Sequence, residues 1–196
     1  MGYTIVGTPR SPFVRICRIL LLKHGLKHDF QALNVLEDEK DAEILSKITP
    51  INKVPVLIDG DKKIFDSRVI VDYLSRKHSW PALTLENENI VTALYSAIDS
   101  TVLMYLMKRD GVDTTKGSFF ISRTRERIPR NLDFIKPWAI KLNPKNDADW
   151  DFASATLYSY LYWAEKRELL DLKPYPHLKD FLEKFKSAPG LAETGF

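Results

Sequence analysis

The sequence predicts an α/β domain followed by an all-helical domain. Short apolar strand patterns alternate with helical patterns up to residue 77, whereas only helical patterns follow residue 86. Between these regions, the segment His78-Ser79-Trp80-Pro81-Ala82 breaks both patterns. A chain of 196 residues with 44% hydrophobic residues can bury a sizeable core, and its length fits one large domain or two modest ones. We therefore expect an α/β domain over residues 1–77, a linker over 78–86 and an all-α domain over 87–196.

The first domain is predicted to follow the order β-α-β-α-β-β-α, which suits a small mixed sheet covered by helices. Its first helix opens at Ser11, with Pro12 at the first helical position, where the missing N–H would be unpaired in any case. The same helix ends at Gly25, a residue favoured just after a helix. The expected elements are strand 3–6, helix 12–24, strand 28–34, helix 38–48, strand 54–59, strand 62–65 and helix 67–77.

The second domain is predicted to consist of helices over 87–109, 118–135, 147–168 and 176–187. At the start of the third helix, Asn146 is expected to act as the cap. Asp149, three residues later, is expected to interact with the same exposed amides. We assign Asp149 this folding role and no chemical one.

The charge and residue counts narrow the classes of function. The net charge of +3 is small against 29 basic and 26 acidic side chains, so we expect no nucleic-acid partner. The basic run 123–130 contains a glutamate and is interpreted as a solvated helix face rather than a phosphate-binding stripe. One cysteine excludes an internal disulfide, and the four scattered histidines give no reason to expect a metal. We expect no membrane-spanning run and a cytoplasmic location.

The dipeptide Val54-Pro55 interrupts an apolar run that otherwise reads as a buried strand. Proline has no backbone donor, so it is normally confined to strand edges, first residues or bulges. We therefore predict that Pro55 stands at an edge or at the start of a strand. The N–H and C=O of Val54 would then be free to pair with an extended peptide ligand.

Two predicted helix N-termini could hold negatively charged groups. The pair Asp66-Ser67 stands directly before an apolar helical pattern, so a Ser or Asp cap is expected there. The exposed amides of such a terminus can bind a carboxylate. Ser11 presents a hydroxyl at the positive end of the first helix, where a thiolate would be stabilised.

Together these three segments resemble the glutathione transferase family, in which a thioredoxin-like domain precedes a helical one. The resemblance covers nearly the whole chain. The Ser-Pro-Phe-Val-Arg opening at Ser11 looks like the family's active-site turn, which carries Ser or Cys. Residues 49–57 look like the segment that ends in a cis-proline, and Asp66-Ser67 looks like the acidic-Ser pair.

The resemblance implies glutathione as co-substrate, with Ser11 activating its thiol for conjugation. The thiolate is the reactive form, and a free thiol has a pKa of about 8.5. Lowering that pKa by two units takes roughly 2.7 kcal/mol of preferential stabilisation of the anion. The residues that the resemblance assigns to glutathione binding are Phe13, Lys53, Val54, Pro55, Asp66 and Ser67. Arg10 is a weaker candidate for the mouth of the site.

The second substrate implied is a small hydrophobic electrophile. Its pocket is expected to include Met104, Tyr105 and Lys108, although Met104 and Tyr105 could equally pack into the helical core. The resemblance also implies a homodimer.

Two other functions remain open. The first is a ligand carrier or regulatory protein-binding module that has the fold without turnover. The second, a glutaredoxin-like oxidoreductase, is disfavoured because a serine at position 11 cannot form a mixed disulfide. Cys17 is no substitute, because it lies within an apolar stripe of the first helix and is interpreted as a small core residue.

Overall fold

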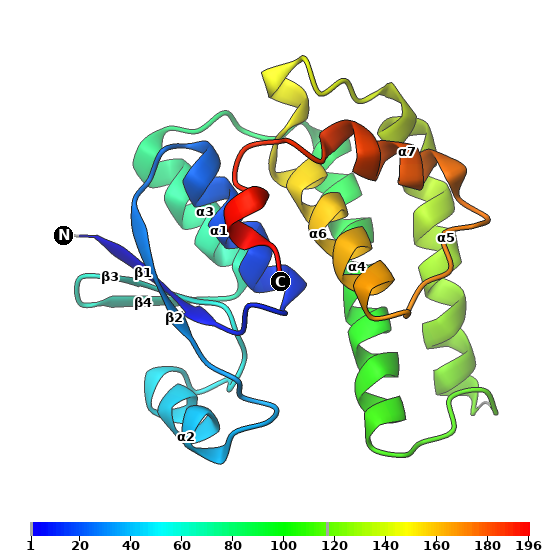
Figure 1. The fold of residues 1–196 in the computed structure, drawn as a ribbon, viewed down its shortest axis with the longest axis horizontal. Helices are drawn as coiled ribbons and strands as arrows, with labels where there is room; N and C mark the ends of the chain where they lie inside the picture. Colours follow the sequence, from blue (N-terminus) through cyan, green and yellow to red (C-terminus); the bar gives the residue numbers. More distant parts are fainter. Residues whose placement is uncertain (1, 117) are drawn as a thin grey trace. The chain divides into compact units, whose positions relative to one another are not determined.

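The computed structural model describes residues 2–116 and 118–196, which form two compact units (Figure 1). The first unit comprises Met1–Ala82 together with Ser187–Phe196, and the second comprises Leu83–Lys186. The predicted second domain, 87–196, therefore differs from the observed unit at its carboxyl end. The reason is that the segment Ser187–Phe196 is held on the first unit by contacts with its first helix, which are described below.

The first unit contains a four-stranded mixed sheet in the order β2-β1-β3-β4. Strand β1 pairs in parallel with β2 and antiparallel with β3, which pairs antiparallel with β4. The strands are β1 (Tyr3–Gly7), β2 (His28–Ala32), β3 (Val56–Asp59) and β4 (Lys62–Phe65). The helices of this unit are α1 (Pro12–Lys23), α2 (Glu39–Ile48), α3 (Ser67–His78) and the 3₁₀ turn η2 (Ala192–Thr194). The predicted order of strands and helices is confirmed.

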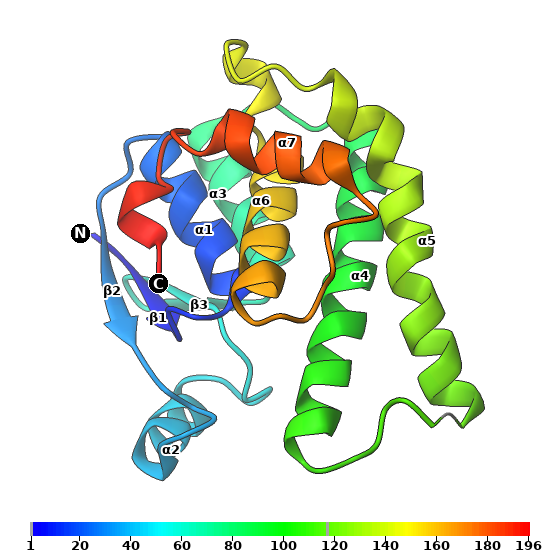
Figure 2. The same cartoon turned by 45° about the vertical axis from the view of Figure 1, so that its right-hand side comes forward.

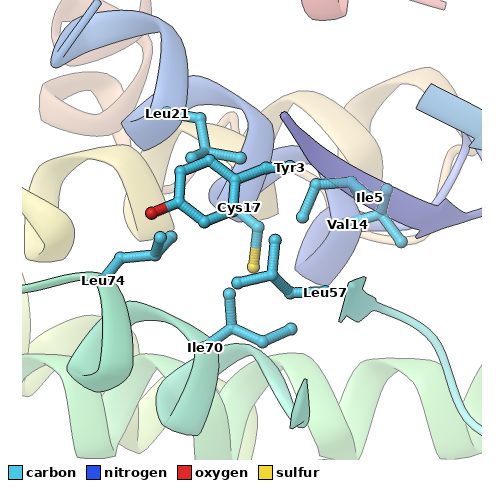
Figure 3. Packing of buried hydrophobic residues seen from close by; sticks show 8 residues of the cluster. All are labelled: Tyr3, Ile5, Val14, Cys17, Leu21, Leu57, Ile70 and Leu74. Atoms are coloured by element: carbon cyan, nitrogen blue, oxygen red, sulfur yellow. The ribbon is translucent and has the colours of Figure 1, made fainter. Parts of the chain in front are cut away.

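The two faces of the sheet are covered by different helices, because successive side chains of a strand point to opposite faces. Ile5 belongs to the larger apolar cluster, which joins β1 and β3 to α1 and α3. Figure 3 shows the eight residues of that cluster, Tyr3, Ile5, Val14, Cys17, Leu21, Leu57, Ile70 and Leu74. Val6, one position along β1, packs instead with Leu45 of α2. Cys17 is fully buried, as interpreted from the sequence, and burial raises the pKa of its thiol.

The second unit is helical, as predicted. Helix α4 packs against both α5 and α6, and α7 packs against α5 and α6. The bounds are α4 (Leu85–Arg109), α5 (Phe119–Lys141), the 3₁₀ turn η1 (Asp147–Asp149), α6 (Phe152–Lys166) and α7 (Pro176–Phe185). Contrary to the sequence expectation, α4 is long and apolar enough to cross a membrane by length and composition alone. In this structure α4 packs against helices α5 and α6 of the same unit.

Two predicted helix boundaries in this unit are wrong. The second helix does not end at residue 135 but continues to Lys141, with Pro129 and Pro137 inside it. Both prolines are exposed, so their rings and the carbonyls left without a donor can face water. The third helix begins at Phe152 rather than at residue 147.

The cap of α6 is Asp151 and not Asn146. Asp151 accepts hydrogen bonds from the backbone N–H groups of Ala153 and Ser154, and the Ser154 side chain bonds back to the N–H of Asp151. Asn146 caps only the short turn η1. The carboxylate of Asp149 is already used within that loop, since it accepts from Asn143 N and from Asn146 Nδ2.

The segment Ser187–Phe196 lies along α1, where Figures 1 and 2 both show η2 beside that helix. Arg18 donates from Nη2 to the carbonyl oxygen of Glu193 over 3.0 Å. Gly190 has a φ of +84°, and a Cβ placed on it would lie 2.9 Å from the carbonyl oxygen of Ile19. This segment therefore approaches the backbone of α1 at a point where only glycine fits.

Candidate active site

Ser11 is held at the amino end of α1 by a tight turn and a helix cap. Its N–H donates to the carbonyl oxygen of Thr8 over 3.1 Å, which closes the turn that follows β1. Its Oγ accepts from the N–H of Val14 over 3.3 Å, which makes Ser11 the N-cap, as predicted. A hydroxyl that accepts one hydrogen bond still has its own O–H to donate. The half-buried Ser11 side chain can therefore donate to an anion placed at this helix terminus.

The Val54–Pro55 segment lies directly before β3. Pro55 is buried and stands one residue outside the strand, so the prediction that it marks a strand start is confirmed. The predicted strand 54–59 accordingly begins two residues later, at Val56. The Val54–Pro55 peptide bond is cis. The half-buried Val54 side chain packs against the apolar clusters on both faces of the sheet.

Asp66 and Ser67 form the amino end of α3. Asp66 is the N-cap, with its carboxylate accepting from the N–H of Arg68 over 2.8 Å, and Ser67 is the first helical residue. Of the two residues, Asp66 is exposed whereas Ser67 is only 2% exposed. Asp66 has a φ of +73°, a region that Asp adopts more readily than most residues. The pair thus places an exposed carboxylate and a buried hydroxyl at the amino end of α3.

The register of the sheet brings these three segments to one end of three neighbouring strands. Val56, at the start of β3, pairs with Val6 in β1 and with Phe65 in β4. The Ser11 turn follows β1 just after Val6, and Asp66-Ser67 follows Phe65 directly. The segments predicted separately from the sequence are therefore neighbours in the fold.

The other predicted glutathione residues lie on the same segments. Lys53 is exposed and stands one residue before Val54, and Phe13 is half-buried in the first turn of α1. Arg10, in the turn before Ser11, forms an ion pair of 2.5 Å with Glu37 in the loop after β2. No local pattern in the sequence predicts this pair, because the two residues are 27 positions apart.

The three residues predicted for the electrophile lie in the carboxyl half of α4, in the second unit. Met104 and Tyr105 are half-buried and Lys108 is exposed. The Tyr105 hydroxyl accepts from Arg167 Nη1 over 2.9 Å, and its ring meets Trp163 edge to face. Arg167 was not foreseen, since no motif marks it. The role of Met104, Tyr105 and Lys108 stays a prediction.

Metal-ligating side chains do not gather in the described part of the chain. Within residues 2–116 and 118–196, no group of three or more His, Cys, Asp or Glu residues could hold a metal ion. At the Ser11 end of the sheet stand the Ser11 hydroxyl, the Asp66 carboxylate and the amino ends of α1 and α3.

Comparison with known proteins identifies a family model that covers much of the first unit. Residues 5–89 match the model described as the glutathione S-transferase N-terminal domain. A GST-like protein of Escherichia coli K12 named YibF, itself uncharacterised, is 29% identical over 150 residues, or 73% of both chains. Glutathione S-transferase Z2 of Arabidopsis thaliana is 24% identical over 191 residues, which are 92% of this chain and 84% of that protein.

Solved structures share the fold over nearly the whole chain. A glutathione S-transferase from Methylobacillus flagellatus, crystallised with glutathione bound, aligns with a TM-score of 0.82 and 20% identity and covers 99% of both chains. A glutathione transferase family member from Pseudomonas fluorescens Pf-5, with bound S-(propanoic acid)-glutathione, aligns with a TM-score of 0.76 and 21% identity. That alignment covers 98% of this chain and 96% of the other.

Proposed function

Because this chain belongs to the glutathione S-transferase family, we propose that it binds glutathione and activates the thiol for conjugation to a small hydrophobic electrophile. In this proposal Ser11 donates its hydroxyl hydrogen bond to the sulfur. The backbone of Val54 pairs with the cysteinyl unit, next to Pro55. Asp66 and Ser67 hold the γ-glutamyl end, Lys53 neutralises the glycyl carboxylate, and Phe13 packs beside the sulfur.

The observation that carries this proposal is the convergence of Ser11, Val54 and Asp66 at one end of the sheet through the pairing of Val56. An extended tripeptide needs a strand-like partner, a site for its carboxylates and a donor for its sulfur. Each requirement is met by a different one of these segments. Relatives crystallised with glutathione bound add support from the family.

The physical requirement for catalysis is a lower thiol pKa in the bound state. A hydrogen bond to a charged acceptor contributes roughly 1.5–3 kcal/mol, so the Ser11 hydroxyl and the amides of α1 are of sufficient strength. These donors interact more strongly with the thiolate than with the neutral thiol and so favour the reactive form. The electrophile would contact Met104, Tyr105 and Lys108 on α4. We also propose a cytoplasmic homodimer, on the basis of family resemblance.

The test is a calorimetric titration of the protein with glutathione, together with a thiolate difference spectrum in the ultraviolet near neutral pH. S-methylglutathione is the matched control ligand, because its sulfur cannot ionise. Binding with a thiolate band that S-methylglutathione does not produce is the expected result. Absence of binding would overturn the proposal.

A second candidate function is a ligand carrier or regulatory protein-binding module without turnover. This candidate has the same fold as the first one, and fold alone does not fix activity. Glutathione binding without a thiolate band would favour the carrier. No binding at all would favour the regulatory module.

A further inference from the structure

Gly7 is placed where a side chain would collide with the start of α1. It is the last residue of β1 and is buried. A Cβ built on Gly7 would lie 2.4 Å from Val14 Cγ2 and 3.3 Å from Val14 Cγ1. Ordinary Cβ contacts begin at 3.4 Å, so Val14 would have to move by about 1 Å to admit a methyl group.

The backbone of Gly7 does not itself require glycine. The described glycines with positive φ are Gly25, Gly60, Gly111 and Gly190, and Gly7 is not among them. Alanine could therefore adopt the same conformation without backbone strain. The constraint at Gly7 is the space that its neighbours occupy.

The Val14 side chain has little room to move away from Gly7. Its side chain is fully buried in the cluster between the sheet and helices α1 and α3. A β-branched side chain in a helix also has one strongly preferred rotamer. A methyl group on Gly7 would therefore push the first turn of α1, rather than only the tip of a side chain.

That first turn is the one that holds the Ser11 hydroxyl, because the N–H of Val14 donates to Ser11 Oγ over 3.3 Å. The same Cβ on Gly7 would lie 3.3 Å from Val54 Cβ. Gly7 thus lies within contact distance of both the first turn of α1 and the Val54 segment.

We propose that Gly7 is a positioning residue of the glutathione site: its missing side chain sets the spacing between the Ser11 hydroxyl and the Val54 backbone. This inference rests on the proposed function. Gly7 touches no substrate and acts through Val14 and Val54. A displacement of the order of 1 Å at a reacting group is enough to cost a large factor in rate.

The test is a cycle of three variants, Gly7→Ala, Val14→Ala and the double variant, with Gly2→Ala as control. A Cβ on Gly2 meets nothing within 4 Å, so Gly2→Ala should behave as the parent protein. Gly7→Ala should bind glutathione roughly tenfold more weakly and raise the kinetic pKa of the bound thiol. Val14→Ala keeps the N–H that bonds Ser11, so its affinity should stay close to that of the parent.

The double variant gives the decisive comparison. Val14→Ala removes both Cγ atoms that a Cβ on Gly7 would meet and leaves only the approach of 3.3 Å to Val54 Cβ, so the double variant should recover most of the affinity of Val14→Ala and most of its thiol pKa. A double variant no better than Gly7→Ala would overturn the inference, as would a Gly7→Ala protein with unchanged affinity and thiol pKa. If Gly7→Ala does not fold, the double variant is compared with Val14→Ala alone. A double variant that folds and has an affinity close to that of Val14→Ala supports the inference, and one that does not fold overturns it.

A measurement without glutathione separates this inference from the proposed function. Hydrogen exchange of the backbone amide of residue 14 reports its bond to Ser11 Oγ in all four variants. Faster exchange in Gly7→Ala than in Gly2→Ala is expected, and equal exchange would overturn the inference. Should the parent protein fail to bind glutathione, the proposed function fails, while the Val14 amide still shows whether Gly7 positions Ser11.

Discussion

Arg15 and Thr194 are joined by a hydrogen bond although 179 positions separate them in the chain. Arg15 Nε donates to Thr194 Oγ1 over 3.2 Å, and Arg15 Nη2 donates to the carbonyl oxygen of Leu191 over 3.5 Å. The Arg15 residue is only 2% exposed. A buried charge is costly unless it is hydrogen-bonded, so these bonds stabilise the buried guanidinium group of Arg15.

Thr194→Val should therefore destabilise the protein by about 1–3 kcal/mol, the cost of leaving a buried donor without its acceptor. The measurement is the free energy of unfolding from urea denaturation. Thr92→Val is the control, since Thr92 is an exposed residue of α4 and its substitution should change stability by roughly 0.5 kcal/mol or less. Equal stability of the two variants would mean that Arg15 finds other partners.

Ser11→Ala should reduce conjugation about 100-fold while weakening glutathione binding much less, because the hydroxyl acts on the charge that develops at the sulfur. Loss of the N-cap should also cost about 1 kcal/mol of stability. Steady-state kinetics and unfolding curves give the two values. Ser11→Asn separates the effects, since Asn is also a good cap but has no hydroxyl. Full activity in either variant would remove the Ser11 hydroxyl from the mechanism.

Ser67→Ala should mainly weaken glutathione affinity, by roughly tenfold, through loss of a hydrogen bond to a charged carboxylate. Calorimetric titration measures the change directly. Ser75→Ala, in the same helix α3, provides the comparison and should bind glutathione as the parent does. If both variants bind equally well, the buried Ser67 serves only the structure of the helix terminus.

Asp59 should make the free energy of unfolding depend on pH in the acidic range. Hydrogen bonds from Lys77 and Tyr73 hold the pKa of Asp59 below its ordinary value. A carboxyl group with a lowered folded-state pKa contributes stability above its unfolded pKa of about 3.9, and loses it as the pH falls further. Asp59→Asn should therefore flatten the fall in unfolding free energy below about pH 4. The exposed Asp72, paired with Arg76, provides the control Asp72→Asn.

Cys17 should be inert in the folded protein. Its side chain is fully buried, so a reagent cannot reach the sulfur. Burial also raises the pKa of the thiol, so the reactive thiolate form is disfavoured. A chromogenic disulfide reagent should label the thiol in denaturant and leave it unlabelled under native conditions. Rapid labelling of the native protein would require an opening of α1 that exposes the core.

Local patterns predicted most of the first unit. Strand 62–65 was placed at its observed bounds, and Ser11 was recognised as a cap because a proline follows it. Pro55 marked the start of β3 for the same kind of reason, namely that proline cannot donate to a strand ladder. These features depend on residues within a few positions of one another, so the sequence exposes them.

Features that depend on distant contacts were not predicted. Nothing near Gly7 in the sequence reveals that Val14 and Val54 lie within reach of its missing side chain. The pairing of Arg10 with Glu37 likewise arises only when the loop after β2 has folded. The local sequence around Asn146 predicts a cap for α6, whereas Asp151, with Ser154 three residues later, forms the capping box of that helix.

The position of Ser187–Phe196 on the first unit has a consequence for the order in which the molecule is built. During synthesis, residues 1–82 leave the ribosome long before residues 187–196 exist. Until then Arg15 lacks the acceptors at Leu191 and Thr194, and Gly190 does not yet lie against the backbone of Ile19. The contacts that surround α1, the helix capped by Ser11, are therefore complete only after the whole second unit has been translated.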